Sequence, residues 1–326
     1  MHEAEVTARA NANVALVKYW GKRDARLNLP ATGSLSLTLD ELGVEASVAF
    51  GVTDADVFEV DGEPARGETA RRLADFVDLV RADMAPRPPV RVRTRAFMPL
   101  GAGLASSAAV FAALALATTR AAGRRLDPPA LSALARRGSG SAARSIFGGF
   151  VEWHLGRRPD GTDSIAEPLA GSGDWDLRMV VAIVSTAPKA VSSRDGMRHA
   201  ATSPFYPAWV AGADADLAEA RTAIAARDLD ALGRVSEHSA LKMHAVGLGA
   251  RPPLLYWQGA TVDCVQRVWR LRAEGVPAYV TIDAGPQVKV LCEATSSAAV
   301  AAALAEVGGV QRVLTCGPGE GARIVT

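Results

Sequence analysis

Two charged residues near opposite ends of the sequence stand where a catalytic site could form. Asp283 ends the apolar stretch YVTID and precedes Ala-Gly-Pro, so a tight turn would present its carboxylate at the edge of a strand. Lys18 follows the apolar run VALV, which predicts that the stem of this lysine is partly buried. A lysine close to Asp283 would keep the carboxylate ionised. The residues alone leave open a plainer alternative, in which Asp283 only initiates a turn.

An arginine and two serines in the segment GSGSAAR form another candidate group. Ser141 and Arg144 are three residues apart, so on a helical turn they face the same side. A guanidinium group matches a carboxylate through two parallel hydrogen bonds, and the hydroxyl of Ser139 would lie nearby. The alternative is a serine-capped helix with a surface arginine.

The segment KAVSSRDGM repeats this combination of hydroxyl groups beside a cation, with Ser192, Ser193 and Arg194. An ordinary capped helix start explains the same pattern. Lys22, in KYWGKRD, adds a further cation that could meet an anion or could belong to a solvated turn.

A glycine- and serine-rich segment, PLGAGLASSAA, runs from Pro99 to Ala109. Gly101 and Gly103 allow close approach of a ligand to the backbone, and Ser106 and Ser107 follow at the start of a predicted helix. Backbone N–H groups at a helix N-terminus bind anions, and the hydroxyls could contact phosphate oxygens or magnesium. No Lys-Ser/Thr pair follows the second glycine, so this is not a Walker loop. The alternative is a tight strand–helix connection with serine caps.

Strands and helices in both halves of the chain must position these residues. Without a regular βα repeat, the pattern predicts a two-layer α+β architecture. The polar, glycine-rich stretch 171–176 predicts a domain boundary, with domains at residues 1–172 and 173–326. The expected strands are residues 34–39, 90–94, 179–184, 277–283 and 287–292, and the main expected helices are 68–84, 213–226, 229–244, 261–274 and 296–307, with further helices after the glycine-rich segment and at Pro128.

Composition narrows the class of protein. The chain has 326 residues, of which 49% are apolar and 22% charged, and its net charge of +1 argues against nucleic-acid binding. The most apolar stretch, residues 104–118, is about 15 residues long, shorter than the ~20 that a membrane span needs. Three cysteines without metal or disulfide spacing fit a cytoplasmic protein.

The glycine-rich segment resembles that of the GHMP kinase superfamily. NVALVKYWGKRDARLNLP, GSGSAARSIFGGFVEW, VSSRDGM and DAGP further resemble diphosphomevalonate decarboxylases, in that family's order. The resemblance implies a GHMP kinase-like two-layer α/β sandwich. Its N-terminal domain would be a ribosomal-protein-like βαβ domain and its C-terminal domain ferredoxin-like, with the active site in the cleft between them.

The resemblance also implies an activity and residue roles. ATP, with Mg²⁺, would phosphorylate the tertiary hydroxyl of mevalonate 5-diphosphate, after which phosphate and CO2 would leave to give isopentenyl diphosphate. Asp283 would act as base toward that hydroxyl beside Lys18, and Arg144 would hold the carboxylate. Family members are often homodimers. The substrate-binding residues implied are Tyr19, Lys22, Ser139, Ser141, Arg144, Ser192, Ser193 and Arg194. The ATP-binding residues implied are Pro99, Gly101, Ala102, Gly103, Leu104, Ala105, Ser106 and Ser107.

Several alternatives stay open at the level of sequence. Gly33 and Gly101 depart from the family pattern, so a decarboxylase of mevalonate 5-monophosphate, or a small-molecule kinase that does not eliminate phosphate, are competing hypotheses. The metal ligands, a choice between Arg71 and Arg72 as a substrate contact, and the moment at which Asp283 takes the proton are equally undecided.

Overall fold

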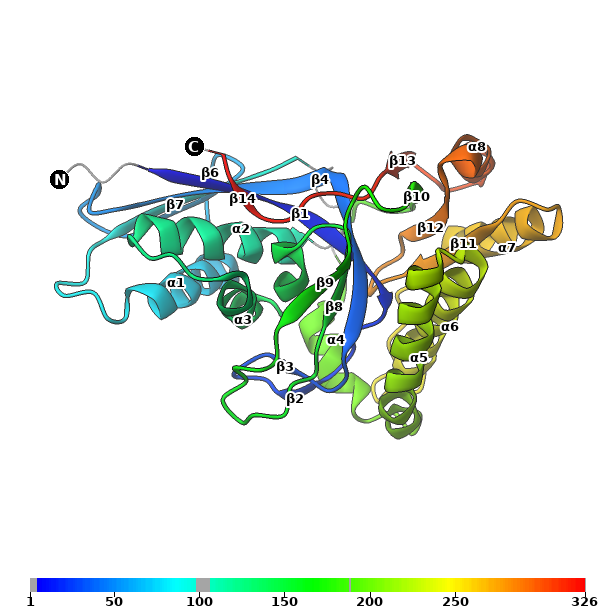
Figure 1. Ribbon diagram of the computed structural model, residues 1–326, viewed down its shortest axis with the longest axis horizontal. Helices are drawn as coiled ribbons and strands as arrows, with labels where there is room; N and C mark the ends of the chain where they lie inside the picture. The colour runs from blue at the N-terminus through cyan, green and yellow to red at the C-terminus, as the bar shows by residue number, and fades with distance from the viewer. Residues whose placement is uncertain (1–4, 98–105, 188, 326) are drawn as a thin grey trace.

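The computed structural model describes residues 5–97, 106–187 and 189–325. These residues form two large, mostly antiparallel sheets with helices packed on them, together with a small two-stranded sheet (Figure 1). The strands are β1 (Val6–Val17), β2 (Lys22–Asp24), β3 (Leu29–Pro30), β4 (Ser34–Phe50), β5 (Val57–Val60), β6 (Glu63–Pro64), β7 (Val90–Ala96), β8 (Phe150–Trp153), β9 (Ala166–Ala170), β10 (Leu177–Ile183), β11 (Ala278–Ile282), β12 (Val288–Glu293), β13 (Arg312–Cys316) and β14 (Arg323–Ile324). The helices are α1 (Gly67–Arg81), α2 (Ser106–Ala121), α3 (Pro128–Gly138), the 3₁₀ helix η1 (Gly140–Ile146), α4 (Ser193–Ala200), α5 (Tyr206–Ala226), α6 (Leu229–Leu248), α7 (Gly259–Ala273), the short 3₁₀ helix η2 (Ala294–Ser296) and α8 (Ser297–Ala305).

The larger sheet has β1 and β4 at its centre. Its strand order is β14-β1-β4-β7-β5-β6, and β8 and β9 extend from the first half of β4. Helices α1, α2 and α3 cover one face of this sheet (Figure 1). The Ala- and Leu-rich α2 lies against the centre of the sheet because its small side chains allow the helix axis to approach β1 and β4 closely.

The smaller sheet, in the order β11-β12-β10-β13, belongs to the second half of the chain. Side chains alternate across it, as strand geometry requires. Val288, Val290 and Cys292 of β12 pack in the core beneath α7 and α8, whereas Leu291 belongs to the core on the opposite face. Lys289 has the same parity as Leu291, so a lysine lies on a face that is otherwise apolar.

A shared core joins the two halves. Residues of β1 and β4, of β10 and β12, and of α5 and α6 pack together there. The last strand, β14, returns to pair with β1, and a bridge between Leu39 and Pro318 holds the chain beside β4. We retain as a proposal the division into residues 1–172 and 173–326, with the C-terminal segment returning to the first sheet.

The α+β class expected from the sequence is confirmed, and the expected helices and strands all occur. Several boundaries were wrong, and three of these differences are the following. The strand expected over residues 34–39 continues to Phe50, the helix expected from residue 213 already begins at Tyr206, and the last helix is shorter than 296–307. Pro207 follows at the start of α5, where a missing backbone N–H costs nothing. Within the described ranges, no helix is long and apolar enough to cross a membrane.

Candidate active site

A cavity of about 460 Å³ opens between the two halves of the molecule. The end of β1, the 3₁₀ helix η1 and the start of α2 supply its wall from the first half. The turn after β11 and the start of α4 supply the wall from the second half. The segments around Lys18 and Asp283, which are 265 residues apart in the sequence, therefore meet at one site.

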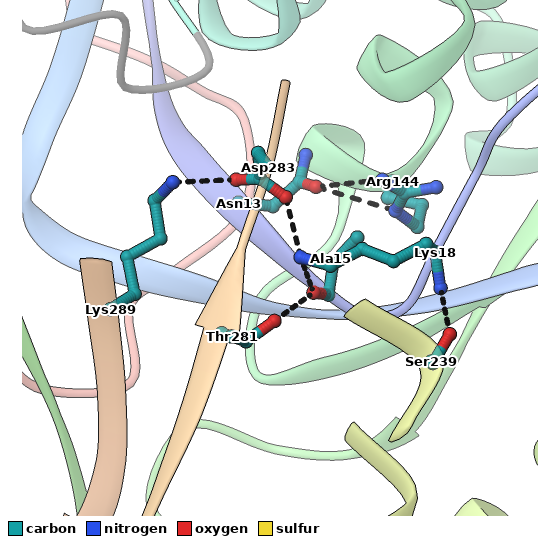
Figure 2. Close-up of polar contacts among 8 residues, drawn as sticks. All are labelled: Asn13, Ala15, Lys18, Arg144, Ser239, Thr281, Asp283 and Lys289. Carbon is teal, nitrogen blue, oxygen red and sulfur yellow. Dashed lines mark hydrogen bonds and ion pairs between the residues drawn. The ribbon is translucent and has the colours of Figure 1, made fainter. Parts of the chain in front are cut away.

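Asp283 lies between two buried lysines, as Figure 2 shows. Lys18 Nζ is 2.6 Å from Oδ1 of Asp283, and Lys289 Nζ is 2.9 Å from Oδ2. The side chains of Lys18 and Lys289 are 1% and 2% exposed, whereas that of Asp283 is 29% exposed. Lys18 Nζ also donates a hydrogen bond to the carbonyl of Ala15, and its backbone N–H donates to Ser239 Oγ. The carboxylate is thus held from both sides and still faces the cavity.

The electrostatics of this group follow from burial and proximity. Burial lowers the pKa of Lys18 to about 8, although the charge of Asp283 acts in the opposite direction. Burial by itself would raise the pKa of Asp283, but the charges of Lys18 and Lys289 outweigh this effect and hold the pKa well below its usual range. Asp283 is therefore an ionised hydrogen-bond acceptor at neutral pH.

Arg144, in η1, is 2% exposed and is oriented by two polar side chains from the large sheet. Its Nε and Nη2 donate to Oδ1 of Asn13 at 3.3 and 3.1 Å, and Nη1 donates to Ser34 Oγ. Asn13 is itself anchored, because its Nδ2 donates to the carbonyl of Ser141 and to Ser145 Oγ. Burial lowers the pKa of Arg144 to about 10, so the guanidinium stays charged at neutral pH. No described carboxylate pairs with it.

Three serine hydroxyls form a row from the start of α2 to η1. Ser107 Oγ is 3.2 Å from Ser139 Oγ, which is 3.4 Å from Ser141 Oγ. The buried hydroxyl of Tyr19 borders the same row and has no hydrogen-bond partner among the described residues. Gly140 allows this approach, because a Cβ there would lie 2.6 Å from Tyr19 Oη. Hydroxyl groups that have no protein partner can donate hydrogen bonds to the oxygen atoms of a bound ligand.

Positive charge accumulates at the other end of the cavity. Lys22, Arg72 and Arg194 line both this cavity and an adjoining one of about 520 Å³. Burial, followed by the charge of Arg194, lowers the pKa values of Lys22 and Arg72, that of Lys22 to about 8. The Arg72 guanidinium donates to the carbonyl of Gly138 and lies over the ring of Phe111. The carboxylate of Glu68, which is 3.6 Å from Arg194, offsets part of the positive charge of both arginines. Such mutual repulsion would be relieved by a bound polyanion.

Ser192, Ser193 and Arg194 lie at the start of α4 and border the cavity. Ser192 is also an ordinary N-cap, since its Oγ accepts from the backbone N–H of Asp195 at 3.1 Å. The capped-helix interpretation is therefore confirmed for Ser192, and its contact with substrate stays a prediction. Lys189 borders the cavity as well, and burial lowers its pKa.

Most of the residues singled out in the sequence meet at this cavity, within the part of the chain that is described. Pro99, Gly101, Ala102, Gly103, Leu104 and Ala105 lie outside the described residues, as does the side chain of Ser106. The structure places Arg72 at the cavity and Arg71 at the surface.

Sequence reasoning missed three residues: Asn13, Ser34 and Lys289. Lys289 interrupts the apolar strand VKVLC, and this was a signal that could have been used. Asn13 and Ser34 carried no comparable signal, because their contact with Arg144 depends on how β1 and β4 pair.

The described residues hold no cluster of three or more His, Cys, Asp or Glu side chains that could bind a metal by themselves. The oxygen donors present are the serine hydroxyls, which suit Mg²⁺ only as additional ligands to phosphate oxygens and water.

The protein combines an α+β fold with a cation-rich cleft, and the helix α2 begins with serines at the edge of this cleft. Together with the similar solved structures, these features place it among ATP-dependent enzymes of the GHMP kinase type. The chain belongs to the diphosphomevalonate decarboxylase family, a family of carboxy-lyases. The family descriptions "Diphosphomevalonate decarboxylase-like N-terminal domain" and "Mevalonate 5-diphosphate decarboxylase C-terminal domain" match residues 10–166 and 179–317.

Individual relatives agree with this assignment. The chain is 36% identical over 306 residues to diphosphomevalonate decarboxylase mvd1 of Aspergillus fumigatus, covering 87% of this chain and 76% of the relative. Mevalonate diphosphate decarboxylase from Staphylococcus aureus superposes with a TM-score of 0.93 at 38% identity, covering 99% of this chain and 98% of the other. MDDEF in complex with MVAPP, AMPPCP and magnesium superposes with a TM-score of 0.92 at 39% identity, covering 98% and 99%.

Proposed function

We propose that this enzyme converts mevalonate 5-diphosphate and ATP to isopentenyl diphosphate, CO2, ADP and phosphate. The observation that carries the proposal is the convergence of Asp283, Arg144 and a cluster of cations on one cavity. The three groups match the three polar parts of the substrate: a tertiary hydroxyl, a carboxylate and a diphosphate. The relative solved with MVAPP, AMPPCP and magnesium supports the same substrates here.

In the proposed mechanism Asp283 accepts the hydrogen bond of the 3-hydroxyl. Each carboxylate oxygen that is paired with a lysine retains a lone pair for this purpose. Its low pKa makes it a weak base, so it orients the hydroxyl first and takes the proton as the phosphoryl group is transferred. Lys18 adds positive charge where negative charge gathers.

Arg144 holds the substrate carboxylate through its guanidinium fork. Once the 3-oxygen carries phosphate, the C–O bond breaks and phosphate leaves with the electron pair. The bond to the carboxylate carbon then breaks, its electrons form the alkene, and CO2 departs. Asn13 and Ser34 fix the plane of the guanidinium, so they orient the carboxylate through Arg144.

The diphosphate is assigned to Lys22, Arg72, Arg194 and the hydroxyls of Ser192 and Ser193. Four of these five residues were already assigned to the substrate from the sequence. The fifth is Arg72, which we choose over Arg71 because it lines the cavity. Three cations share one end of the cavity, and the charge of Arg194 lowers the pKa values of Lys22 and Arg72. This accumulation of positive charge favours the diphosphate over the monophosphate as substrate.

ATP is assigned to the side of the cavity where α2 begins, with Ser107 among its contacts. The proposed contacts Pro99, Gly101, Ala102, Gly103, Leu104, Ala105 and Ser106 belong to the same segment. Mg²⁺ would accompany ATP and shield its phosphate charge, with Ser107 and Ser139 as the described hydroxyls able to join its ligands.

An assay with ATP, each phosphorylated mevalonate in turn, and detection of CO2 tests this function. We expect CO2 and ADP in equal amounts and a higher kcat/KM for the diphosphate. A preference for the monophosphate would overturn the substrate assignment. A stable phosphorylated acid without CO2 would show a kinase.

The proposal extends to location and assembly. Cys264, Cys292 and Cys316 are all free and buried, as is usual in a reducing cytoplasm. A homodimer is proposed from the family resemblance, and light scattering on the purified enzyme measures the mass directly.

A further inference from the structure

We propose that Lys289 is a positioning residue for Asp283: it occupies the second carboxylate oxygen, fixes the rotation of the carboxylate and keeps it ionised during turnover. The inference rests on the proposed function, because it assigns Asp283 to the substrate hydroxyl. Lys289 lies outside the four short segments whose sequence resembles the family, although it lies within the matched C-terminal domain.

The location of Lys289 is the first argument. It lies in the middle of the small sheet, where its register neighbours are Thr281 on β11 and Val181 on β10. Its side chain is 2% exposed and shares a face with Leu291. A lysine in such a place is costly unless its charge is compensated. The ion pair that Lys289 forms within the described residues is with Asp283.

The geometry of the pair is the second argument. Lys18 contacts Oδ1 and Lys289 contacts Oδ2, so the two ammonium groups approach different oxygens (Figure 2). One ion pair would leave the carboxylate free to rotate about its Cβ–Cγ bond, whereas two ion pairs fix its plane. Asp283 lies just beyond the end of β11, so its own strand does not restrain it. Restraint of the acceptor matters because small misplacements of a catalytic group reduce turnover strongly.

The charges around Asp283 indicate that Lys289 has an effect of its own on this carboxylate, in addition to that of Lys18. The titratable and charged groups that face Asp283 are Lys18 from β1, Lys289 from β12, Lys189 from the segment after β10, Arg144 from η1 and His244 from α6. His244 is neutral at neutral pH because burial lowers its pKa to about 4. Among the residues that the structure describes, Lys18 and Lys289 contact the carboxylate directly, and removal of either withdraws a full neighbouring charge.

The test compares Lys289→Met, Lys289→Arg and the wild type. For Lys289→Met we expect kcat to fall about 10- to 100-fold, while the KM values for both substrates change less than about threefold. The acid limb of the kcat–pH profile should move to higher pH, since loss of a positive neighbour raises the pKa of a carboxylate. Lys289→Arg keeps the positive charge, so the acid limb of its kcat–pH profile should lie where it does in the wild type. Its kcat should lie between those of Lys289→Met and the wild type.

Lys242→Met is the control, because it removes another lysine that forms an ion pair with an aspartate, although Lys242 is only partly buried. Lys242 Nζ is 2.6 Å from Asp216 Oδ2, between α6 and α5 and away from the cavity. This variant should change stability but leave kcat and the acid limb as in the wild type. Equal effects of Lys289→Met and Lys242→Met on kcat would overturn the inference.

A second measurement separates this inference from the proposed function. In protein labelled with ¹³C at the aspartate carboxyls, the Asp283 resonance, assigned by its absence in Asp283→Asn, reports the titration directly. A higher pKa in Lys289→Met together with the loss of kcat supports the inference, and any other combination overturns it. Wild-type enzyme that releases no CO2 would refute the proposed function, and the titration would still report whether Lys289 controls the carboxylate.

Discussion

At the scale of single residues, the carboxylate of Asp283 is ionised and accepts from two ammonium groups while part of it faces the cavity. Asp283→Asn keeps the shape but places an amide N–H₂ against a lysine, so both acceptance of the substrate hydroxyl and the ion pairs are damaged. We expect kcat to fall by about 10²- to 10⁴-fold. The Kd for ATP, measured by equilibrium titration, should change by less than about twofold. Turnover within tenfold of the wild type would remove Asp283 from its assigned role.

A second prediction at the scale of single residues concerns the guanidinium of Arg144. Arg144→Lys keeps a positive charge but loses the planar fork that Asn13 and Ser34 orient. Loss of a bidentate contact to a carboxylate corresponds to about 3 kcal/mol, or about 100-fold in kcat/KM for the phosphorylated substrate. Steady-state kinetics with each substrate varied in turn measure this, and the KM for ATP should stay close to the wild-type value.

The control for Arg144 is Arg81→Lys. Arg81 is also a buried arginine, 3% exposed, but it pairs with Asp56 beside α1, away from the cavity. It should lower stability without changing kcat/KM. If Arg144→Lys decarboxylates normally, the carboxylate of the substrate lies elsewhere.

At the scale of elements, η1 controls the width of the cavity through a single missing side chain. A Cβ at Gly140 would lie 2.6 Å from Tyr19 Oη and 2.8 Å from its ring. Tyr19 cannot retreat easily, because its ring packs edge-on against Trp153 with centroids 4.8 Å apart. Gly140→Ala should therefore displace the tyrosine hydroxyl and lower kcat/KM for the phosphorylated substrate by about 10- to 100-fold.

Gly259→Ala is the control for this variant, since nothing lies within 4 Å of a Cβ added at the start of α7. It should be kinetically silent. A silent Gly140→Ala would mean that Tyr19 moves freely and does not position the substrate.

At the scale of the whole molecule, one buried histidine links stability to pH. Burial lowers the pKa of His244 from 6.5 to about 4, so the unfolded chain binds a proton between these values that the folded chain does not. The free energy of unfolding should therefore decrease as the pH falls from 6.5 to 4, by about 3 kcal/mol from this residue. His244→Leu should remove this contribution and make the pH dependence shallower, as urea unfolding at several pH values measures.

His238→Gln is the comparison, because His238 lies on the same helix but is exposed. Its pH dependence should follow that of the wild type. Identical slopes for His244→Leu and the wild type would show that His244 is not the group that titrates.

The sequence by itself determined the α+β class, most elements and the main residues of the candidate site. Apolar periodicity located the strand before Asp283 and the helices α6 and α7, because burial of one face imposes that spacing. The family resemblance singled out Lys18, Arg144 and Asp283, and the cavity brings all three together.

Only the tertiary structure decided how those residues are held. Periodicity states which face of a strand a side chain occupies but not which strand from the other half of the chain lies opposite. The pairing of β1 with β4 brings Asn13 and Ser34 to Arg144, and the packing of the two sheets brings Lys289 to Asp283. The orientation of α1 likewise brings Arg72 to the cavity and leaves Arg71 exposed. Lys18 and Asp283 are 265 residues apart in the sequence. Contacts between segments so far apart depend on how the whole core packs, which local sequence patterns do not specify.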